Sequence, residues 1–155
     1  MEHTFYRTVT FTRPANTTAY TALDVVGATA AALAFPATSG IGSPFIIKSL
    51  DVQINQATAA ATVFRLHLYS VTPGSALGDN AAFDLPAGDQ PYYLGYADTA
   101  SAVDLGVINF ATSAVLNKGV MVAESASIFG YLQCITGFTP ESGITGTVTI
   151  YCEGN

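Results

Sequence analysis

The sequence predicts an all-β protein, an antiparallel β-sandwich of jelly-roll type with eight to nine short strands. Apolar and polar residues alternate over short stretches, which is the period of a β-strand. Residues typical of turns separate these stretches at regular intervals. No segment shows the 3.6-residue period of an amphipathic helix. Among all-β folds, two packed sheets are the arrangement that we favour for these 155 residues.

The first alternating stretch spans residues 4–13. One face of this expected strand carries Phe5, Arg7, Val9 and Phe11. Pro14 ends the pattern because proline lacks the backbone N–H that a sheet uses. We therefore expect residues 1–19 to form an N-terminal strand or, alternatively, an arm that orders only against a neighbouring molecule. Residues 20–155 are expected to form a single β-sandwich domain.

The next strands are expected at residues 20–27 and 28–35. The second of these is rich in alanine, but it lacks a helix cap and an apolar stripe, so a short strand is favoured over a helix. Residues 45–55 and 62–70 alternate clearly and predict a hairpin with a longer loop.

The C-terminal half predicts four more segments. Residues 102–110 are expected to form a strand, with Val103, Leu105 and Val107 in phase. Residues 115–122 are expected to turn at Asn-Lys-Gly, with the glycine at positive φ. Residues 128–136 and 146–152 are expected to pair as the last hairpin.

Residues 62–70 form the clearest strand in the sequence. Phe64, Leu66 and Leu68 should point to the core, because they share one face. The opposite face carries large amphipathic side chains, Val63, Arg65, His67 and Tyr69. This face is expected to meet solvent or a neighbouring subunit. The connector that follows, from Val71 onward, is rich in turn-forming residues.

The composition favours a subunit that lies packed against other subunits. Charged residues make up only 10% of the chain, against roughly 25% in ordinary soluble domains. The net charge is −6, and the five Lys and Arg residues are scattered singly. Nucleic acid is not an expected partner, since its phosphates require a basic stripe. No apolar run reaches the length of a membrane span, and the start resembles no signal peptide, so a membrane is not an expected partner either.

No residue pattern predicts catalysis, and no enzyme activity, metal or cofactor is expected. The two histidines are His3 and His67, and no Gly-x-Ser-x-Gly motif accompanies them. His67 is interpreted as an outward residue on a half-exposed strand. The carboxylates of the connector region and beyond are interpreted as ordinary turn chemistry; they are Asp79, Asp84, Asp89, Asp98 and Asp104.

Two further groups of side chains leave alternatives open. Tyr92, Tyr93 and Tyr96 could form a carbohydrate platform, but core or interface packing explains them equally well. Cys134 and Cys152 are expected to point inward on neighbouring strands. Two buried thiols are favoured for a cytoplasmic product, and a disulfide formed after release from the cell is the alternative.

Several blocks of the sequence resemble a family of small structural proteins of tailed bacteriophages, encoded among the head genes. The blocks cover most of residues 20–150; they are residues 20–27, 47–50, 64–69, 79–83, 93–96, 129–132 and 137–140. The resemblance implies a β-sandwich on the capsid surface of the virion, made in the cytoplasm of the host bacterium. The implied function is that of a capsid decoration protein, with the major capsid protein as partner and a homotrimer as the first oligomer to consider. The alternative is a head-fibre or tail-associated module that adheres to host surface glycans.

We expect two groups of residues to contact other subunits. The first is Phe5, Tyr6 and Arg7 near the N-terminus. The second is the outward row Arg65, His67 and Tyr69. Both groups are large and amphipathic, as is typical of protein interfaces.

Overall fold

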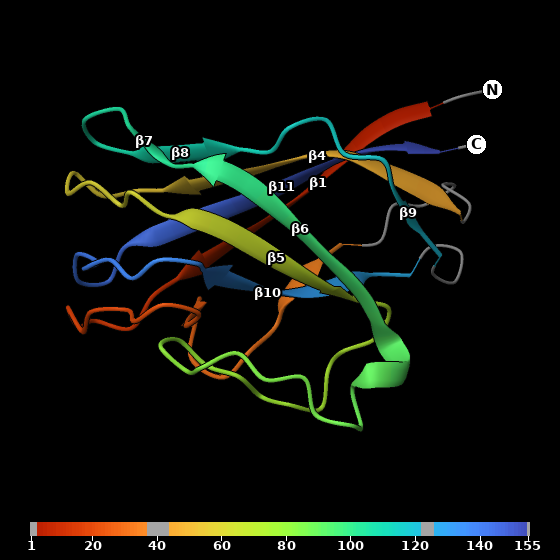
Figure 1. Ribbon diagram of the computed structural model, residues 1–155, viewed down its shortest axis with the longest axis horizontal. Helices are drawn as coiled ribbons and strands as arrows, with labels where there is room; N and C mark the ends of the chain where they lie inside the picture. The colour runs from red at the N-terminus through yellow and green to blue at the C-terminus, as the bar shows by residue number, and fades with distance from the viewer. Residues whose placement is uncertain (1–2, 37–43, 122–125, 155) are drawn as a thin grey trace.

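The computed structural model describes residues 3–36, 44–121 and 126–154, and it confirms an all-β sandwich of two antiparallel sheets (Figure 1). The first sheet has the order β1 (His3–Thr12), β11 (Thr145–Gly154), β4 (Phe45–Ile54), β8 (Asn109–Thr112), β7 (Val103–Asp104), and β9 (Lys118–Val120) also pairs with β4. The second sheet has the order β2 (Val25–Val26), β10 (Ile128–Cys134), β5 (Val63–Tyr69), β6 (Tyr93–Ser101), and β3 (Leu33–Phe35) also pairs with β10. A short 3₁₀ turn, η1 (Gln90–Tyr92), precedes β6.

The strand order is that of a jelly roll, as expected. Strands far apart in the sequence pair in a nested series: β1 with β11, β2 and β3 with β10, β4 with β8 and β9, and β5 with β6. The two predicted hairpins are therefore wrong, because β4 and β5 lie in different sheets, as do β10 and β11. Alternation shows which face of a strand is buried, but not which strand lies beside it.

The main core fills the space between the sheets. Phe64, Leu66 and Leu68 of β5 point into it and are fully buried, which confirms their prediction. The first sheet contributes fully buried side chains from β4 and β11, namely Leu50, Val52, Ile54, Val148 and Ile150. A sandwich with one continuous apolar layer of this kind needs no disulfide at 155 residues.

The N-terminal stretch is a strand of the sandwich. β1 pairs with β11 along its whole length, from His3 opposite Gly154 to Thr12 opposite Thr145. The ring of Phe11 packs directly over Gly146, its partner on β11, where any Cβ would collide with the ring. The arm alternative is wrong for residues 3–12, and residues 1–2 lie outside the described part.

Several predicted strands differ in extent. Only Val25–Val26 of residues 20–27 is a strand, and residues 102–110 divide into β7 and β8 around a turn. The turn expected at Asn-Lys-Gly is wrong: Gly119 lies within β9, opposite Ile46. Positive φ occurs instead at Gly106, in the turn between β7 and β8. Residue 122 lies outside the described part.

Candidate interaction surfaces

The connector, residues 70–92, covers the outer face of the second sheet (Figure 1). Below it lies a small second core whose buried members are Val25, Tyr69 and Tyr131. The connector contributes Leu77, Phe83 and Leu85 to this cluster. The Tyr131 hydroxyl donates a hydrogen bond to the carbonyl of Ser75 and so holds the connector against β10.

His67 lies inside this second core. Its ring stacks on Phe83, with the ring centroids 3.6 Å apart and the planes at 12°. Nδ1 is 2.9 Å from the hydroxyl of Tyr93, and Nε2 is 3.0 Å from Oε1 of Gln133. Burial lowers the pKa of His67 to about 4. The side chain is therefore neutral at pH 7, with both nitrogens engaged, and acts as a packing and hydrogen-bonding group.

The outward row of β5 was expected to meet solvent or a neighbouring subunit. This is wrong for His67 and Tyr69, which are only 4% and 0% exposed, because the chain's own connector covers them. A signal for this lay in the sequence: a turn-rich segment that carries Leu77, Phe83 and Leu85 has apolar side chains to bury. Whether the row contributes to an interface stays a prediction.

Arg65 is the member of the row that reaches the surface. Its guanidinium binds both carboxylate oxygens of Asp98, at 2.7 and 2.8 Å. It also lies over the ring of Tyr96, 4.0 Å from the centroid. The Tyr93 hydroxyl bonds Nδ1 of His67, and the ring centroids of Tyr93 and Tyr96 lie 5.9 and 6.0 Å from that of His67. Whether these tyrosines form a carbohydrate platform stays a prediction.

Asp79 has a different role from the one predicted. It forms a buried ion pair with Arg13, 2.9 Å between Oδ2 and Nη2, and the two side chains are 4% and 0% exposed. The hydroxyl of Tyr20 donates to Asp79, and the backbone N–H of Gly27 donates to it at 3.2 Å. Burial is the largest cause of the raised pKa of the Tyr20 hydroxyl, and the hydrogen bond to Asp79 raises that pKa further. Asp79 therefore ties the connector to the segment that follows β1, beyond ordinary turn chemistry.

Asp89 and Asp104 do serve turns. Asp89 accepts the backbone N–H groups of Gly74 and Ser75, at 2.7 and 3.1 Å. Asp104 accepts the N–H of Gly106 at 2.8 Å. Among the residues that the structure describes, no group of three or more His, Cys, Asp and Glu side chains could hold a metal ion. No helix in the described ranges is long and apolar enough to cross a membrane.

The N-terminal candidates point to different sides of β1. Tyr6 is 67% exposed on the outer face of the first sheet, with its ring centroid 6.3 Å from that of Tyr151. Phe5 packs edge-on against Phe45, with centroids 5.5 Å apart. Arg7 is 3% exposed, and its guanidinium lies 5.0 Å from the ring centroid of Phe45. Of the three, Tyr6 is the residue free to meet another molecule directly.

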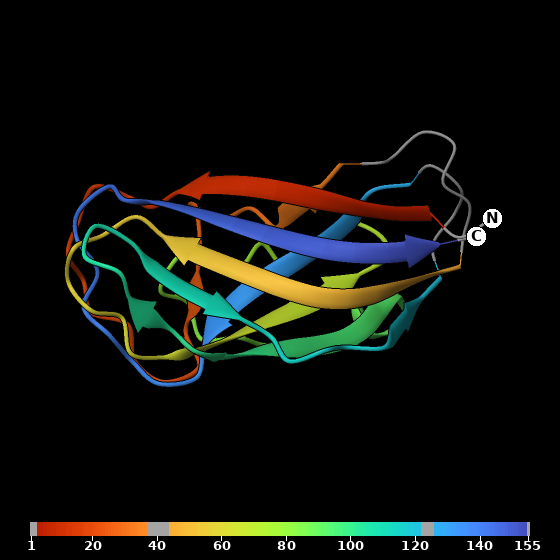
Figure 2. The ribbon, with the colours of Figure 1, turned by 90° about the horizontal axis from the view of Figure 1, so that it is seen from above.

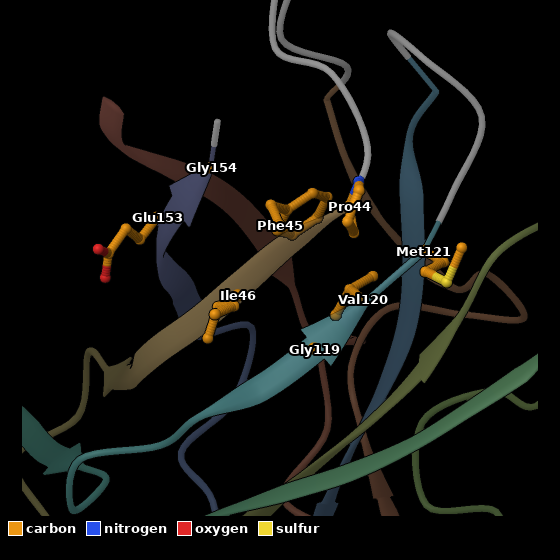
Figure 3. Close-up of a pocket in the computed structure, with 8 residues that line it drawn as sticks. All are labelled: Pro44, Phe45, Ile46, Gly119, Val120, Met121, Glu153 and Gly154. Carbon is orange, nitrogen blue, oxygen red and sulfur yellow. The ribbon is translucent and has the colours of Figure 1, made fainter. Parts of the chain in front are cut away.

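Two hollows lie near the ends of β1, β4 and β11. The larger, about 450 Å³, lies between β4, β9 and β11, and Figure 3 shows the eight residues that line it. They are apolar apart from Glu153, and Met121 stands at its rim. The smaller, about 290 Å³, lies beside Tyr6, Lys48 and Tyr151. Neither hollow gathers the polar groups that would fix a small ligand.

A set of strongly exposed apolar side chains lies within residues 103–121. We call it the apolar flank, and its members are 58% to 81% exposed: Val103, Leu105, Val107, Val115 and Met121. Val103, Leu105 and Val107, which are in phase in the sequence, do not lie on one continuous strand. The strand breaks at Gly106, and the resulting short hairpin carries these side chains into solvent. Their alternating pattern is the same whether they face a core or an interface, so the sequence could not separate the two.

The two cysteines are free and buried, as the favoured interpretation expected. Cys134 is on β10 and Cys152 on β11, which belong to different sheets and are not neighbouring strands as expected. Burial raises the pKa of Cys134 to about 11 and that of Cys152 to about 12. Both thiols are therefore protonated at neutral pH and act as small apolar groups.

Comparison with known proteins gives no family. No family model matches the chain, and no curated protein matches it. A BFDV capsid protein from a 60-mer is 11% identical over 100% of this chain and 94% of its own, with a TM-score of 0.40. A chain of the cyanophage Pam1 capsid is 15% identical over 99% of this chain and 85% of its own, with a TM-score of 0.36. A chain of the Macrobrachium rosenbergii nodavirus VLP is 10% identical over 99% of this chain and 92% of its own, also with a TM-score of 0.36. The jelly-roll assignment rests on the strand order of the chain itself.

Proposed function

We propose that this chain is a virion structural protein, a capsid decoration protein that binds the outer surface of a phage head and bridges neighbouring capsomers. Its partner is the major capsid protein. It is made in the cytoplasm of the host bacterium and functions on the virion surface. A homotrimer is the first oligomer to test. The proposal rests on the sequence resemblance described above and on the exposed apolar side chains of the apolar flank.

The apolar flank is the observation that carries the proposal. Five apolar side chains within residues 103–121 are strongly exposed, on a chain with only 10% charged residues. Large exposed apolar patches mark binding surfaces for other macromolecules, and we propose that these five side chains contribute to such a surface. A flat protein shell offers the extended, largely neutral surface that the apolar flank could cover.

Many modest contacts would give the attachment its strength. Each copy would bury a few apolar side chains, each contributing roughly 1.5–3 kcal/mol when fully covered. Linked copies in an oligomer raise the total avidity, because the second and third contacts become intramolecular. No chemistry at a catalytic site is needed for this role.

Binding to empty shells tests the proposal. Purified protein is mixed with expanded, undecorated capsids of its own phage and centrifuged, and the pellet is assayed for the protein. We expect the wild type to co-sediment and Val107→Lys with Val115→Lys to lose most of its binding. The control is Val71→Lys, which places the same charge at an exposed apolar residue of the connector, outside the flank. Failure of the wild type to co-sediment would overturn the proposal.

The second candidate is a head-fibre or tail-associated module that adheres to host surface glycans. The exposed ring of Tyr96, held by the guanidinium of Arg65, is the observation that favours it. This function predicts that the isolated protein binds cells or glycans, that Tyr96→Ala abolishes this binding, and that capsids are equally stable without the protein.

A further inference from the structure

β1 forms an outer edge of the first sheet (Figure 2). Its ten residues pair with β11 on one side. On the other side, alternate residues of an edge strand direct their N–H and C=O groups outward. Within residues 3–36, 44–121 and 126–154, no backbone group bonds to this side of β1. A free edge of this kind is a template for another strand.

The other edges of the two sheets are poor templates. The far edge of the first sheet is built from β7, β8 and β9, which have two, four and three residues. One edge of the second sheet is built from β2 and β3, with two and three residues. β6 has nine residues, but its pairing with β5 shifts register at two places, and Gly95 has positive φ. Short strands and irregularities of this kind discourage edge-to-edge pairing.

β1 has none of these protective features. Its register with β11 is unbroken, and proline occurs only after its end, at Pro14. The side chains on the outer face are uncharged: Thr4, Tyr6, Thr8, Thr10 and Thr12. The strand's arginine, Arg7, is turned inward under the sheet and is buried. A long, regular, neutral edge rich in threonine favours pairing with a further strand.

We propose that β1 pairs antiparallel with β1 of a second copy of this chain, across a two-fold axis at Thr8. In this register Thr8 lies opposite Thr8 of the partner subunit, and the overlap covers residues 4–12. Tyr6 lies opposite Thr10 of the partner subunit, and Thr4 opposite Thr12 of the partner subunit. The first sheet then continues from one copy into the next.

Two constraints select this register. Directly opposed residues of antiparallel strands point to the same face, so the axis must pass through a residue of β1. An axis at Arg7 gives an equally long overlap, but it sets two guanidinium groups opposite each other, which is unfavourable. Axes nearer either end leave fewer residues paired.

The pairing of β1 with β11 already contains threonine opposite threonine, the arrangement that the proposed contact would repeat. On the outer face, the hydroxyl of Thr8 lies 3.0 Å from that of Thr149, and Thr10 is similarly placed with Thr147 at 3.3 Å. Threonine opposite threonine is a favourable cross-strand pair. In the proposed contact, Thr8 would lie opposite Thr8 of the partner subunit, as it already lies opposite Thr149 in its own chain.

This contact is independent of capsid binding. A two-fold contact alone gives a dimer, and together with a three-fold contact elsewhere it gives a hexamer. The oligomer can therefore be tested on the purified protein, and its failure leaves the proposed function standing.

Disulfide trapping tests the register. In the proposed dimer the two Thr8 Cα atoms are about 4.5–5.5 Å apart, within the range of a disulfide. The matched control is Thr149→Cys, on the same face and directly opposite Thr8. The two Thr149 positions would be three strand spacings apart, about 14 Å, beyond the roughly 7 Å that a disulfide can bridge. Wild type, with its two buried thiols, is oxidised in parallel.

We expect mild oxidation to convert Thr8→Cys into a covalent dimer, while Thr149→Cys and wild type stay uncrosslinked. Absence of the link in Thr8→Cys, or equal linking of both variants, would overturn the proposal. A charge at the axis gives a second test by light scattering. Thr8→Lys should halve the mass of the wild-type particle, whereas Thr149→Lys should keep it; a monomeric wild type would also overturn the proposal. Circular dichroism checks that both lysine variants are folded.

Discussion

His67 is uncharged in the folded protein because burial lowers its pKa to about 4. In the unfolded chain the ring titrates near 6.5. Below pH 6.5 the unfolded state therefore binds a proton at His67, whereas the folded state does not bind it until about pH 4. The free energy of unfolding consequently falls as the pH falls. The loss begins near pH 6.5 and levels off below about pH 4, and its full extent is about 3 kcal/mol.

Urea unfolding at pH 7 and at pH 4.5 measures this loss. We expect His67→Gln to be less stable than wild type at pH 7, because it loses the stack on Phe83. Its stability should nevertheless fall less between the two pH values, since glutamine does not titrate. An equal fall in wild type and variant would contradict the role given to burial. The NMR titration midpoint of His67 near pH 4 is the direct check.

The ion pair of Arg13 and Asp79 is the second prediction for single residues. Asp79→Asn removes the negative charge and leaves the guanidinium buried without its partner, which should cost about 3–5 kcal/mol of stability. The comparison is Asp98→Asn, which breaks the partly exposed pair with Arg65 and should cost about 1 kcal/mol or less. Denaturant unfolding of both variants checks the difference. Equal losses would show that burial of the first pair is unimportant.

The burial of Cys134 and Cys152 predicts how the chain reacts with thiol reagents. Both are buried, and burial raises the pKa of each well above neutral pH. A thiol reagent at pH 8 should label neither in the native protein and both in urea. Two unreactive sulfurs in urea under non-reducing conditions would indicate a disulfide and contradict the free thiols.

The connector is the element that turns the outer face of the second sheet into a second core. Phe83 of the connector stacks on the imidazole of His67. Phe83→Ala should expose the imidazole, raise the pKa of His67 toward 6.5 and destabilise the protein by roughly 2 kcal/mol. The control is Phe110→Ala, which removes a half-buried ring from β8 and should leave that pKa unchanged. An unchanged NMR midpoint in Phe83→Ala would show that the connector does not desolvate His67.

At the level of elements, the sequence predicts strands better than it predicts their partners. The inward face of β5 is correct because Phe64, Leu66 and Leu68 are simply too apolar to be exposed. Val103, Leu105 and Val107 show the same alternation, yet they lie at a sheet edge where no opposite sheet covers them. Pairing fails for a related reason: the long connectors between β4 and β5, and between β10 and β11, cross from one sheet to the other.

For the whole molecule, the fold class follows from composition and period, because short alternating segments can bury apolar surface only in a sandwich or barrel. The candidate surfaces follow less well. His67 and Tyr69 are large and amphipathic, as interface residues are, but a segment of the same chain covers them. That depends on where residues 70–92 fold, which local sequence patterns do not reveal. The apolar flank became visible only through the three-dimensional structure.

Electron cryo-microscopy of expanded capsids mixed with the protein tests the central claim most directly. The account predicts sandwich-shaped density on the outer surface, bridging neighbouring capsomers, with residues 103–121 facing the shell. Capsids without added density, or density attached only at a tail or a single vertex, would contradict it.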